Sequence, residues 1–414
     1  MTDPAISDVS APARTGRDPN KVVVFDTTMR DGEQAPGFSM SPDDKVLMGK
    51  ALKSLGVDVI EAGFAAASPG DEDCIRAVVG ELAEDDSGPV FCSLSRANEG
   101  DIDASYRALK GTKRRRAHVF IGTSPIHRAA KLKMTADQVL ANAVRAVSHA
   151  RTMFEDVEFS AEDAFRTEPE FLAEILEAAV VAGATTLNVP DTVGYATPDE
   201  VATRFRFLAD RIHPRYPNVI FSSHSHNDLG MAVANTLAAI EGGVRQVETT
   251  INGIGERAGN ASLEEVVMAL RVRSEYYGVH TDVDTTKLLS TSRLLSQITE
   301  SPIVRNKAIV GINAFAHEAG IHQHGMLADS RTYEIMRPED VGFEGSYFVL
   351  GKHSGRHAVA KRAEVLGHPL VGTHLTAAFA AFKTRADEIG EINDAELITI
   401  CTTTKSAEPA HAAA

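Results

Sequence analysis

The alternation of short apolar runs with amphipathic stretches constrains the fold of this chain more than any other feature. From residue 22 to about residue 275, runs rich in β-branched residues alternate with segments of helical periodicity. Eight runs are predicted to be strands: Val22–Phe25, Val57–Ala62, Val90–Leu94, His118–Ile121, Val157–Ser160, Thr186–Val189, Val219–Ser223 and Val247–Ile251. Predicted helices include Asp43–Leu55, Ala136–Met153, Pro169–Ala182, Pro198–Ile212, Ala232–Glu241 and Leu263–Ser274. Eight strand–helix units over about 250 residues match an α/β fold of the (β/α)8 TIM-barrel type, whereas a doubly wound sheet usually has fewer strands and a Gly-rich first turn.

The alternation stops after Leu289, which divides the chain into two predicted parts. We assign residues 21–289 to the barrel domain and residues 290–402 to a small helical accessory subdomain. The accessory part carries two Gly- and His-rich stretches, Gly311–Gly325 and Leu350–His357, before the helical segment Leu375–Ile389. Residues 1–20 and 403–414 lack an apolar pattern and are expected to be disordered tails.

Composition excludes several classes of protein. With 414 residues, of which 43% are hydrophobic, the chain can bury a full core. A net charge of −15 disfavours nucleic acid and anionic membranes as partners, because both require a basic face. The basic run Lys113–Arg116 is interpreted as a solvated edge between a helix and a strand. Three separated cysteines and the lack of a signal peptide predict a cytoplasmic protein.

Three polar fragments follow the first, seventh and eighth predicted strands. They are Arg30–Gln34, His224–Asp228 and Asn252–Asn260. In a (β/α)8 barrel the carboxyl ends of all strands meet at one mouth, where the active site of this fold lies. The fragments supply one carboxylate, two imidazoles and an amide, which is a suitable ligand set for one divalent cation.

Each of these residues also has a plainer explanation. Two histidines spaced as His224 and His226 point to the same face of a strand, but such a pair is often only a core feature. A single aspartate in a turn, such as Asp31, is usually a cap. The glycines before Asn260 are spaced one residue too widely for a dinucleotide fingerprint and follow the last strand instead of the first. Together the three fragments favour a metal site at the barrel mouth.

The same fragments resemble a known family. Arg-Asp-Gly-Glu-Gln at 30–34, His-Ser-His-Asn-Asp-Leu-Gly at 224–230 and Asn-Gly-Ile-Gly-Glu-Arg-Ala-Gly-Asn at 252–260 are similar to the 2-isopropylmalate and homocitrate synthases. The resemblance extends from about residue 21 to residue 400. It implies a Claisen-type condensation of acetyl-CoA with a 2-oxo acid on one divalent metal ion, Mn²⁺, Zn²⁺ or Mg²⁺. By position, the implied metal ligands are Asp31, His224, His226 and Asn260.

Further roles are implied by the same resemblance. Arg30 matches the residue that faces the ketone oxygen, and Glu162 matches an acid near the reacting carbons. His322 matches the candidate base for the acetyl methyl group, with Tyr333 beside it. In this family the subdomain that bears the base reaches over the partner's barrel, so a homodimer is implied. The implied oxo-acid contacts are Asn188, Pro190 and Thr192.

The identity of the oxo acid is interpreted from the end of the substrate that differs within the family. Homocitrate synthases usually carry an arginine four residues before the acid of the fifth strand, where this chain has Glu158. An anion there would repel the second carboxylate of 2-oxoglutarate. We therefore favour 3-methyl-2-oxobutanoate and 2-isopropylmalate synthesis for leucine. His324 departs from the Asp that is usual in this branch, and the leucine-binding regulatory domain of about 100 residues is expected to be absent.

Other functions stay open at this stage. A homocitrate, citramalate or other alkylmalate synthase would use the same metal site with another 2-oxo acid. A lyase of the same superfamily would place a cysteine between Gly253 and Asn260, where none occurs, and a biotin-dependent carboxyltransferase would need a metal-bridging lysine. A metal-binding regulatory protein is the alternative outside enzymology. Thr192, taken alone, could equally be a helix N-cap after the sixth strand.

Overall fold

A computed structural model of the chain describes residues 18–83, 87–345 and 347–406 and divides into two compact units. Unit 1 ends at Ile303 and unit 2 begins at Val304. The division lies later than Leu289 because helix α10 (Leu288–Ile298) packs against α1 (Pro42–Leu55) in unit 1. Of the two predicted tails, residues 1–17 and 407–414 lie outside the described residues, whereas residues 403–406 are helical.

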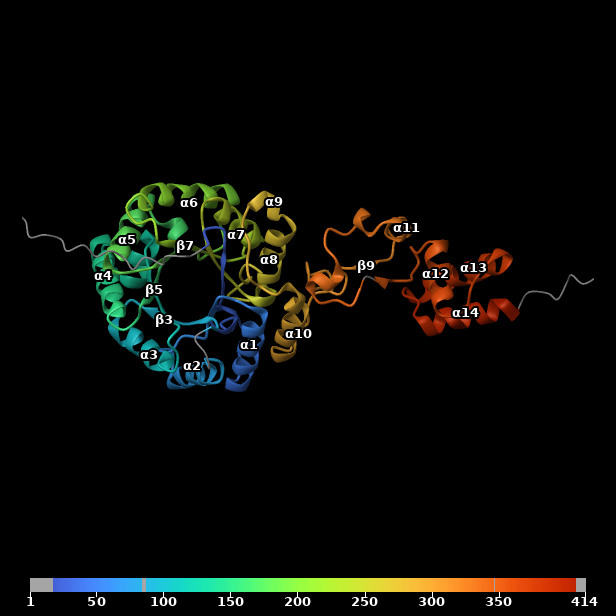
Figure 1. The fold of residues 1–414 in the computed structure, drawn as a ribbon, viewed down its shortest axis with the longest axis horizontal. Helices are drawn as coiled ribbons and strands as arrows, with labels where there is room; N and C mark the ends of the chain where they lie inside the picture. The colour runs from blue at the N-terminus through green and yellow to red at the C-terminus, as the bar shows by residue number, and fades with distance from the viewer. Residues whose placement is uncertain (1–17, 84–86, 346, 407–414) are drawn as a thin grey trace, which may run out of the picture. The chain divides into compact units, whose positions relative to one another are not determined.

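Unit 1 is a closed barrel of eight parallel strands in sequential order, as predicted (Figure 1). β1 pairs with β8, with Phe25 opposite Glu248, which closes the sheet on itself. The strands are β1 (Val23–Asp26), β2 (Val59–Glu61), β3 (Val90–Arg96), β4 (Arg115–Gly122), β5 (Asp156–Glu162), β6 (Thr186–Asp191), β7 (Ile220–Ser225) and β8 (Gln246–Thr249).

Helices surround the barrel, and their ends follow from local sequence signals. Ser41, Thr135 and Thr197 form capping boxes at the starts of α1, α4 and α6. Gly56, with φ 87°, ends α1 in a left-handed conformation that suits glycine. The helices that follow α1 around the barrel are α2 (Pro69–Leu82), α3 (Glu99–Leu109), α4 (Ala136–Arg151), α5 (Pro169–Ala182), α6 (Pro198–Ile212), α7 (Ala232–Glu241), α8 (Leu263–Val272) and α9 (Ser274–Tyr277). Short helical turns are η1 (Thr28–Gly32), η2 (His127–Leu132), η3 (Ala164–Arg166), η4 (Ile251–Gly253) and η5 (Thr285–Lys287).

Unit 2 is mainly helical. Its two short strands, β9 (Ala316–His317) and β10 (Tyr347–Phe348), pair in parallel. Its helices pack around a separate apolar core that contains Val359, Phe382 and Leu397. The elements are α11 (Gly320–Ala328), α12 (Arg356–Val365), α13 (Gly372–Ile389) and α14 (Asp394–Ser406), with η6 (Ser330–Thr332) and η7 (Pro338–Val341).

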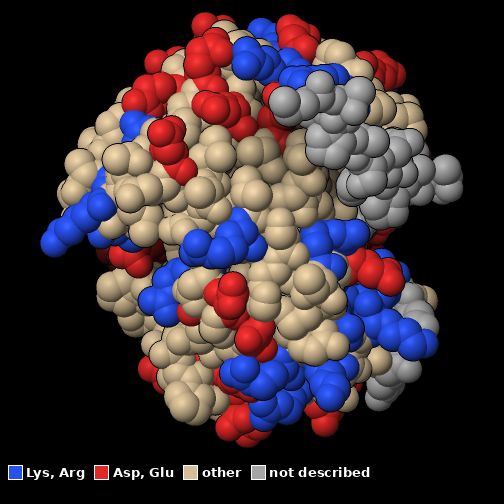
Figure 2. Space-filling model, turned by 90° about the vertical axis from the view of Figure 1, so that its left-hand side faces the viewer, with Lys and Arg blue, Asp and Glu red and all other residues tan. Residues whose placement is uncertain are grey.

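The surface carries charged side chains of both signs. On the face shown in Figure 2, Lys and Arg side chains lie among Asp and Glu side chains. Within the described residues, no helix combines the length and the apolar character that a membrane span needs.

The interior of the barrel contains charged side chains, and one of them corrects a prediction. Arg116 on β4 is 2% exposed and is no part of a solvated edge. Its Nη1 donates to Glu158 Oε2 at 2.9 Å and to Gln246 Oε1 at 2.7 Å, and its Nη2 donates to Asp156 Oδ2 at 3.1 Å. The expectation failed because the barrel turns every second residue of β4 inward, and here the inward residue is an arginine.

Replacing Arg116 should destabilise unit 1. The substitution Arg116→Met would leave Asp156 and Glu158 buried without their cation, which typically costs about 3–5 kcal/mol in the free energy of unfolding. Urea unfolding followed by circular dichroism measures this loss. The exposed Arg76, paired with Glu72 on α2, is the matched control, and Arg76→Met should cost about 1 kcal/mol or less. Equal urea midpoints for Arg116→Met and the unsubstituted protein would contradict the expectation.

Candidate active site

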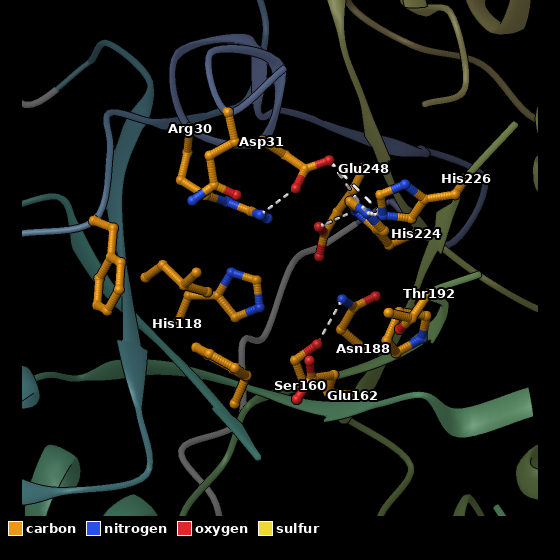
Figure 3. A pocket seen from close by; sticks show the side chains of 15 residues that line it. Arg30, Asp31, His118, Ser160, Glu162, Asn188, Thr192, His224, His226 and Glu248 are labelled. Atoms are coloured by element: carbon orange, nitrogen blue, oxygen red, sulfur yellow. Dashed lines mark hydrogen bonds and ion pairs between the residues drawn. The ribbon is translucent and has the colours of Figure 1, made fainter. Parts of the chain in front are cut away.

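The carboxyl ends of the strands surround a pocket of about 220 Å³ (Figure 3). Every lining residue belongs to unit 1. The lining combines charged and polar groups with apolar side chains. The lining residues are Arg30, Asp31, Gln34, Phe64, Leu94, His118, Phe120, Ser160, Glu162, Asn188, Pro190, Thr192, His224, His226 and Glu248.

The four predicted metal ligands converge at one side of this pocket. The Nε2 atoms of His224 and His226 lie 2.9 Å apart, and both lie within 3.9 Å of Asp31 Oδ2. Asn260 donates from Nδ2 to Asp31 Oδ2 at 2.6 Å, while its buried Oδ1 has no hydrogen-bond partner among the described residues. All four side chains are buried. Fragments separated by up to 229 residues therefore form one cluster.

The charge states of these side chains suit a divalent cation. Burial lowers the pKa of His224 to about 4 and that of His226 to about 3, so both imidazoles are neutral near pH 7. Burial opposes ionisation of Asp31, but Arg30 and the nearby imidazoles outweigh it and hold the pKa of this carboxyl well below its usual value. Neutral imidazoles and a carboxylate are the forms that bind metal ions.

Local backbone conformation places the ligands. After β1 the chain makes the turn η1, in which Thr27 Oγ1 accepts from the Asp31 backbone N at 3.2 Å. After β8 the chain folds back through Gly259, whose φ is 93°. A Cβ at Gly259 would lie 2.0 Å from Gly253 O, so only glycine fits. This return brings Asn260 into a bridge with His226 on the neighbouring β7 extension.

Arg30 lies beside the candidate ligands and is held by two carboxylates. Its Nη1 donates to Asp31 Oδ1 and its Nε donates to Glu61 Oε2, each at 2.7 Å. Glu61 Oε1 lies 2.8 Å from His118 Nδ1. Burial alone would lower the pKa of His118, but the charge of Glu61 raises it to about 9. Glu61 therefore orients a guanidinium and an imidazolium at the pocket.

Sequence reasoning missed Glu61, His118 and Glu248. Each is a charged or titratable residue inside a run that otherwise reads as an apolar strand, such as Val59-Ile-Glu61. A polar side chain that is buried in a strand must have a partner. This signal could have identified the three residues as parts of the site.

The predicted oxo-acid contacts also line the pocket. Asn188 Nδ2 donates to Ser160 Oγ at 2.9 Å, and Pro190 lies opposite His224 in the β6–β7 pair. Thr192 Oγ1 accepts from the Asp163 backbone N at 2.9 Å. The N-cap of α6 is Thr197, so the alternative explanation of Thr192 as a helix cap is wrong.

Glu162, the predicted acid, lines the same pocket. Lys131 Nζ lies 2.8 and 2.9 Å from its two carboxylate oxygens. Lys131 belongs to η2, which follows β4. The acid therefore has a cationic partner from the neighbouring strand–helix connection.

The interpretation of Glu158 needs correction. This side chain does not line the pocket but lies deeper, where it accepts from Arg116 and from Gln246 Nε2. Burial raises its pKa to about 7. Glu158 therefore presents no free negative charge to a substrate, and Ser160, two residues further along β5, is the lining residue.

His322 and Tyr333 lie together in unit 2. His322 is on α11, and its ring centroid lies 4.4 Å from that of Tyr333, which follows η6. Both side chains are exposed. The structure thus pairs the two residues with each other.

Comparison with known proteins agrees with this site. The HMGL-like family profile matches residues 21–295, and the homocitrate synthase post-HMGL domain-like profile matches residues 309–389. The chain is 55% identical over 378 residues to the 2-isopropylmalate synthase of Aquifex aeolicus, covering 91% of this chain and 72% of that protein. It is 53% identical over 380 residues to the 2-isopropylmalate synthase of Heliobacterium modesticaldum, covering 92% and 73%.

Solved structures with lower sequence identity share the fold. Hydroxymethylglutaryl-CoA lyase from Pseudomonas aeruginosa superposes with a TM-score of 0.59 at 19% identity, covering 69% of this chain and 95% of that one. The carboxyl transferase domain of Rhizobium etli pyruvate carboxylase gives 0.53 at 17% identity, covering 70% and 49%. Taken with the two matching profiles and the relatives above 50% identity, the geometry of the site leads to one conclusion. The chain belongs to the HMGL-like family, in its 2-isopropylmalate synthase branch.

Proposed function

We propose that this protein condenses acetyl-CoA with 3-methyl-2-oxobutanoate to give 2-isopropylmalate and CoA, a step of leucine biosynthesis. The observation that carries the proposal is the pocket itself, where Asp31, His224 and His226 lie close together in a lining that also includes Arg30 and apolar side chains. The methyl carbon of the acetyl group forms a bond to the keto carbon, and water then cleaves the thioester. Relatives above 50% identity that are 2-isopropylmalate synthases support the choice.

The donor set supports one divalent cation, Mn²⁺, Zn²⁺ or Mg²⁺. The neutral His224 and His226, the ionised Asp31 and the unpartnered Oδ1 of Asn260 would hold it. When bound there, the ion would engage the keto and carboxylate oxygens of the oxo acid and polarise the ketone. Thr192, which lines the same pocket, is proposed to hold that carboxylate through its hydroxyl.

Arg30 is proposed to stabilise the negative charge that develops on the ketone oxygen. Its guanidinium lines the pocket and is fixed in advance by Asp31 and Glu61, so no reorganisation is needed during the reaction. Glu162, which lines the same pocket, is proposed as the acid near the reacting carbons.

The wall of the pocket supports a branched apolar tail on the oxo acid. Phe64, Leu94, Phe120 and Pro190 provide apolar surface. The permanently cationic lining residue, Arg30, is already paired with carboxylates, and the imidazolium of His118 is paired with Glu61. A second carboxylate on the substrate would therefore be buried without a free cation, which is costly.

A panel of 2-oxo acids tests the substrate. With acetyl-CoA, release of free CoA thiol should give a specificity constant for 3-methyl-2-oxobutanoate more than about tenfold that for 2-oxoglutarate, a difference of at least about 1.4 kcal/mol. Reactions without oxo acid correct for thioester hydrolysis. Preference for 2-oxoglutarate would indicate a homocitrate synthase, and preference for pyruvate a citramalate synthase. Metal binding without turnover of any oxo acid would indicate a non-catalytic metal-binding protein.

Removing the Arg30 guanidinium should affect turnover more than binding. Loss of one group that stabilises an oxyanion typically lowers kcat by about 10² to 10³, so Arg30→Ala should show a loss of this size with a small change in the Michaelis constant of the oxo acid. Steady-state kinetics of CoA release measures both. A raised Michaelis constant with unchanged kcat would make Arg30 a binding residue only.

Removing a metal ligand should abolish tight metal binding. His224→Ala in chelator-stripped protein should weaken Mn²⁺ binding by more than about 100-fold, because even outer-shell partners of a metal ligand contribute about 10- to 100-fold. Isothermal titration calorimetry measures the affinity. His213→Ala, which removes a half-buried histidine bonded to Val219 O, is the control and should bind Mn²⁺ normally. Unchanged affinity in His224→Ala would contradict the ligand assignment.

The base is proposed to come from unit 2 of a partner chain. We propose that His322, assisted by Tyr333, removes a proton from the acetyl methyl group in a homodimer. Mixing an inactive His322→Ala chain with an inactive Glu162→Ala chain should then restore about a quarter of the activity, since half of the dimers are mixed and each holds one intact site. Lack of recovery after verified subunit exchange would argue for a site built within one chain.

A further inference from the structure

We propose that Glu248 is a positioning residue that sets the tautomer and ring orientation of His224 and thereby the affinity of the site for its divalent cation. The inference rests on the proposed metal site and assigns a role to a residue that is not itself a predicted ligand. Its test separates the two claims, because metal binding by the unsubstituted protein is measured alongside.

The strand register places the two side chains together. His224 on β7 and Glu248 on β8 are direct partners in the parallel pair, and both point into the barrel. Glu248 Oε2 lies 2.8 Å from His224 Nδ1. Glu248 is 1% exposed and His224 is 5% exposed, so water does not compete for this contact.

This hydrogen bond determines which nitrogen of His224 is available. An ionised Glu248 accepts hydrogen bonds only, so in that state Nδ1 of His224 donates and carries the proton. Nε2 then keeps its lone pair and points at His226 Nε2 and Asp31 Oδ2. The bond also prevents rotation of the ring away from the other ligands.

The second imidazole has no such support. His226 Nδ1 is buried and has no hydrogen-bond partner within the described part of the chain. Its ring orientation therefore depends on the backbone bridge to Asn260 and on the metal itself. The ring of His224 is held by a carboxylate, whereas the ring of His226 is not. Replacing Glu248 should therefore lower the affinity of the site for its metal ion strongly.

The surroundings of Glu248 argue against a purely structural ion pair. Its Oε1 has no hydrogen-bond partner among the described residues. The titratable groups that face it are His118 on β4 and Glu158 on β5, each with a ligand-type atom within 4.8 Å of a Glu248 oxygen, together with Glu61 and Arg30. The hydrogen bond with His224 is the contact that joins this carboxylate to a predicted metal ligand.

Two near-isosteric variants distinguish positioning from a simple effect of charge. Glu248→Gln keeps a carbonyl oxygen within reach of His224 Nδ1 but removes the negative charge. Glu248→Asp keeps the charge but withdraws the carboxylate by one methylene. Positioning predicts that Glu248→Asp loses about 10- to 100-fold in Mn²⁺ affinity, while Glu248→Gln loses clearly less. A role through charge alone predicts the reverse order.

The measurement is isothermal titration of chelator-stripped protein with Mn²⁺ alone, so it does not depend on turnover. Asp101→Asn is the control, because Asp101 is also buried but bonds to Arg96 and to no predicted ligand. It should bind Mn²⁺ as the unsubstituted protein does. Equal affinities for Glu248→Asp and the unsubstituted protein, or a larger loss in Glu248→Gln, would overturn the inference. Lack of Mn²⁺ binding by the unsubstituted protein would instead overturn the proposed metal site.

Discussion

Ion pairs buried along the barrel axis determine where the functional groups of this protein can lie. Arg116 joins β4 to β5 and β8 at one level, and Glu61 joins β2 to Arg30 and to His118 of β4 at the next. Inward side chains of a parallel barrel stack in layers, so each pair connects different strands. A shift of one strand would leave a charge buried without its partner, which costs several kcal/mol. The polar interior thus fixes the strand positions on which the pocket depends.

The same interior holds carboxylates that burial keeps close to neutrality. Burial raises the pKa of both Glu158 and Glu248 to about 7, the latter against the opposing effect of His118. Glu61, in contrast, is ionised beside Arg30 and the imidazolium of His118. A divalent cation bound next to Glu248 would favour the ionised form of this carboxyl.

Local patterns in the sequence were sufficient for the scaffold. β-Branched runs marked all eight strands, and three helices, Pro169–Ala182, Pro198–Ile212 and Ala232–Glu241, have the predicted bounds. Glu158 and Arg116 were misinterpreted because the usual rule, apolar inside and polar outside, fails where the barrel interior is itself charged. His322 and Tyr333 lie together in unit 2, and their contribution to the pocket stays a proposal.

The sequence by itself determined the eight strand–helix units and the motifs that end the first, seventh and eighth strands, because periodicity and turn residues act over a few neighbouring positions. Only the tertiary structure decided that Asp31 and Asn260, 229 residues apart, share a hydrogen bond, that Glu61 orients Arg30 and His118, and that Glu248 meets His224. These contacts depend on the register between strands and on closure of the sheet. Both are set by which buried charges can pair across the whole barrel, and no local pattern contains that information.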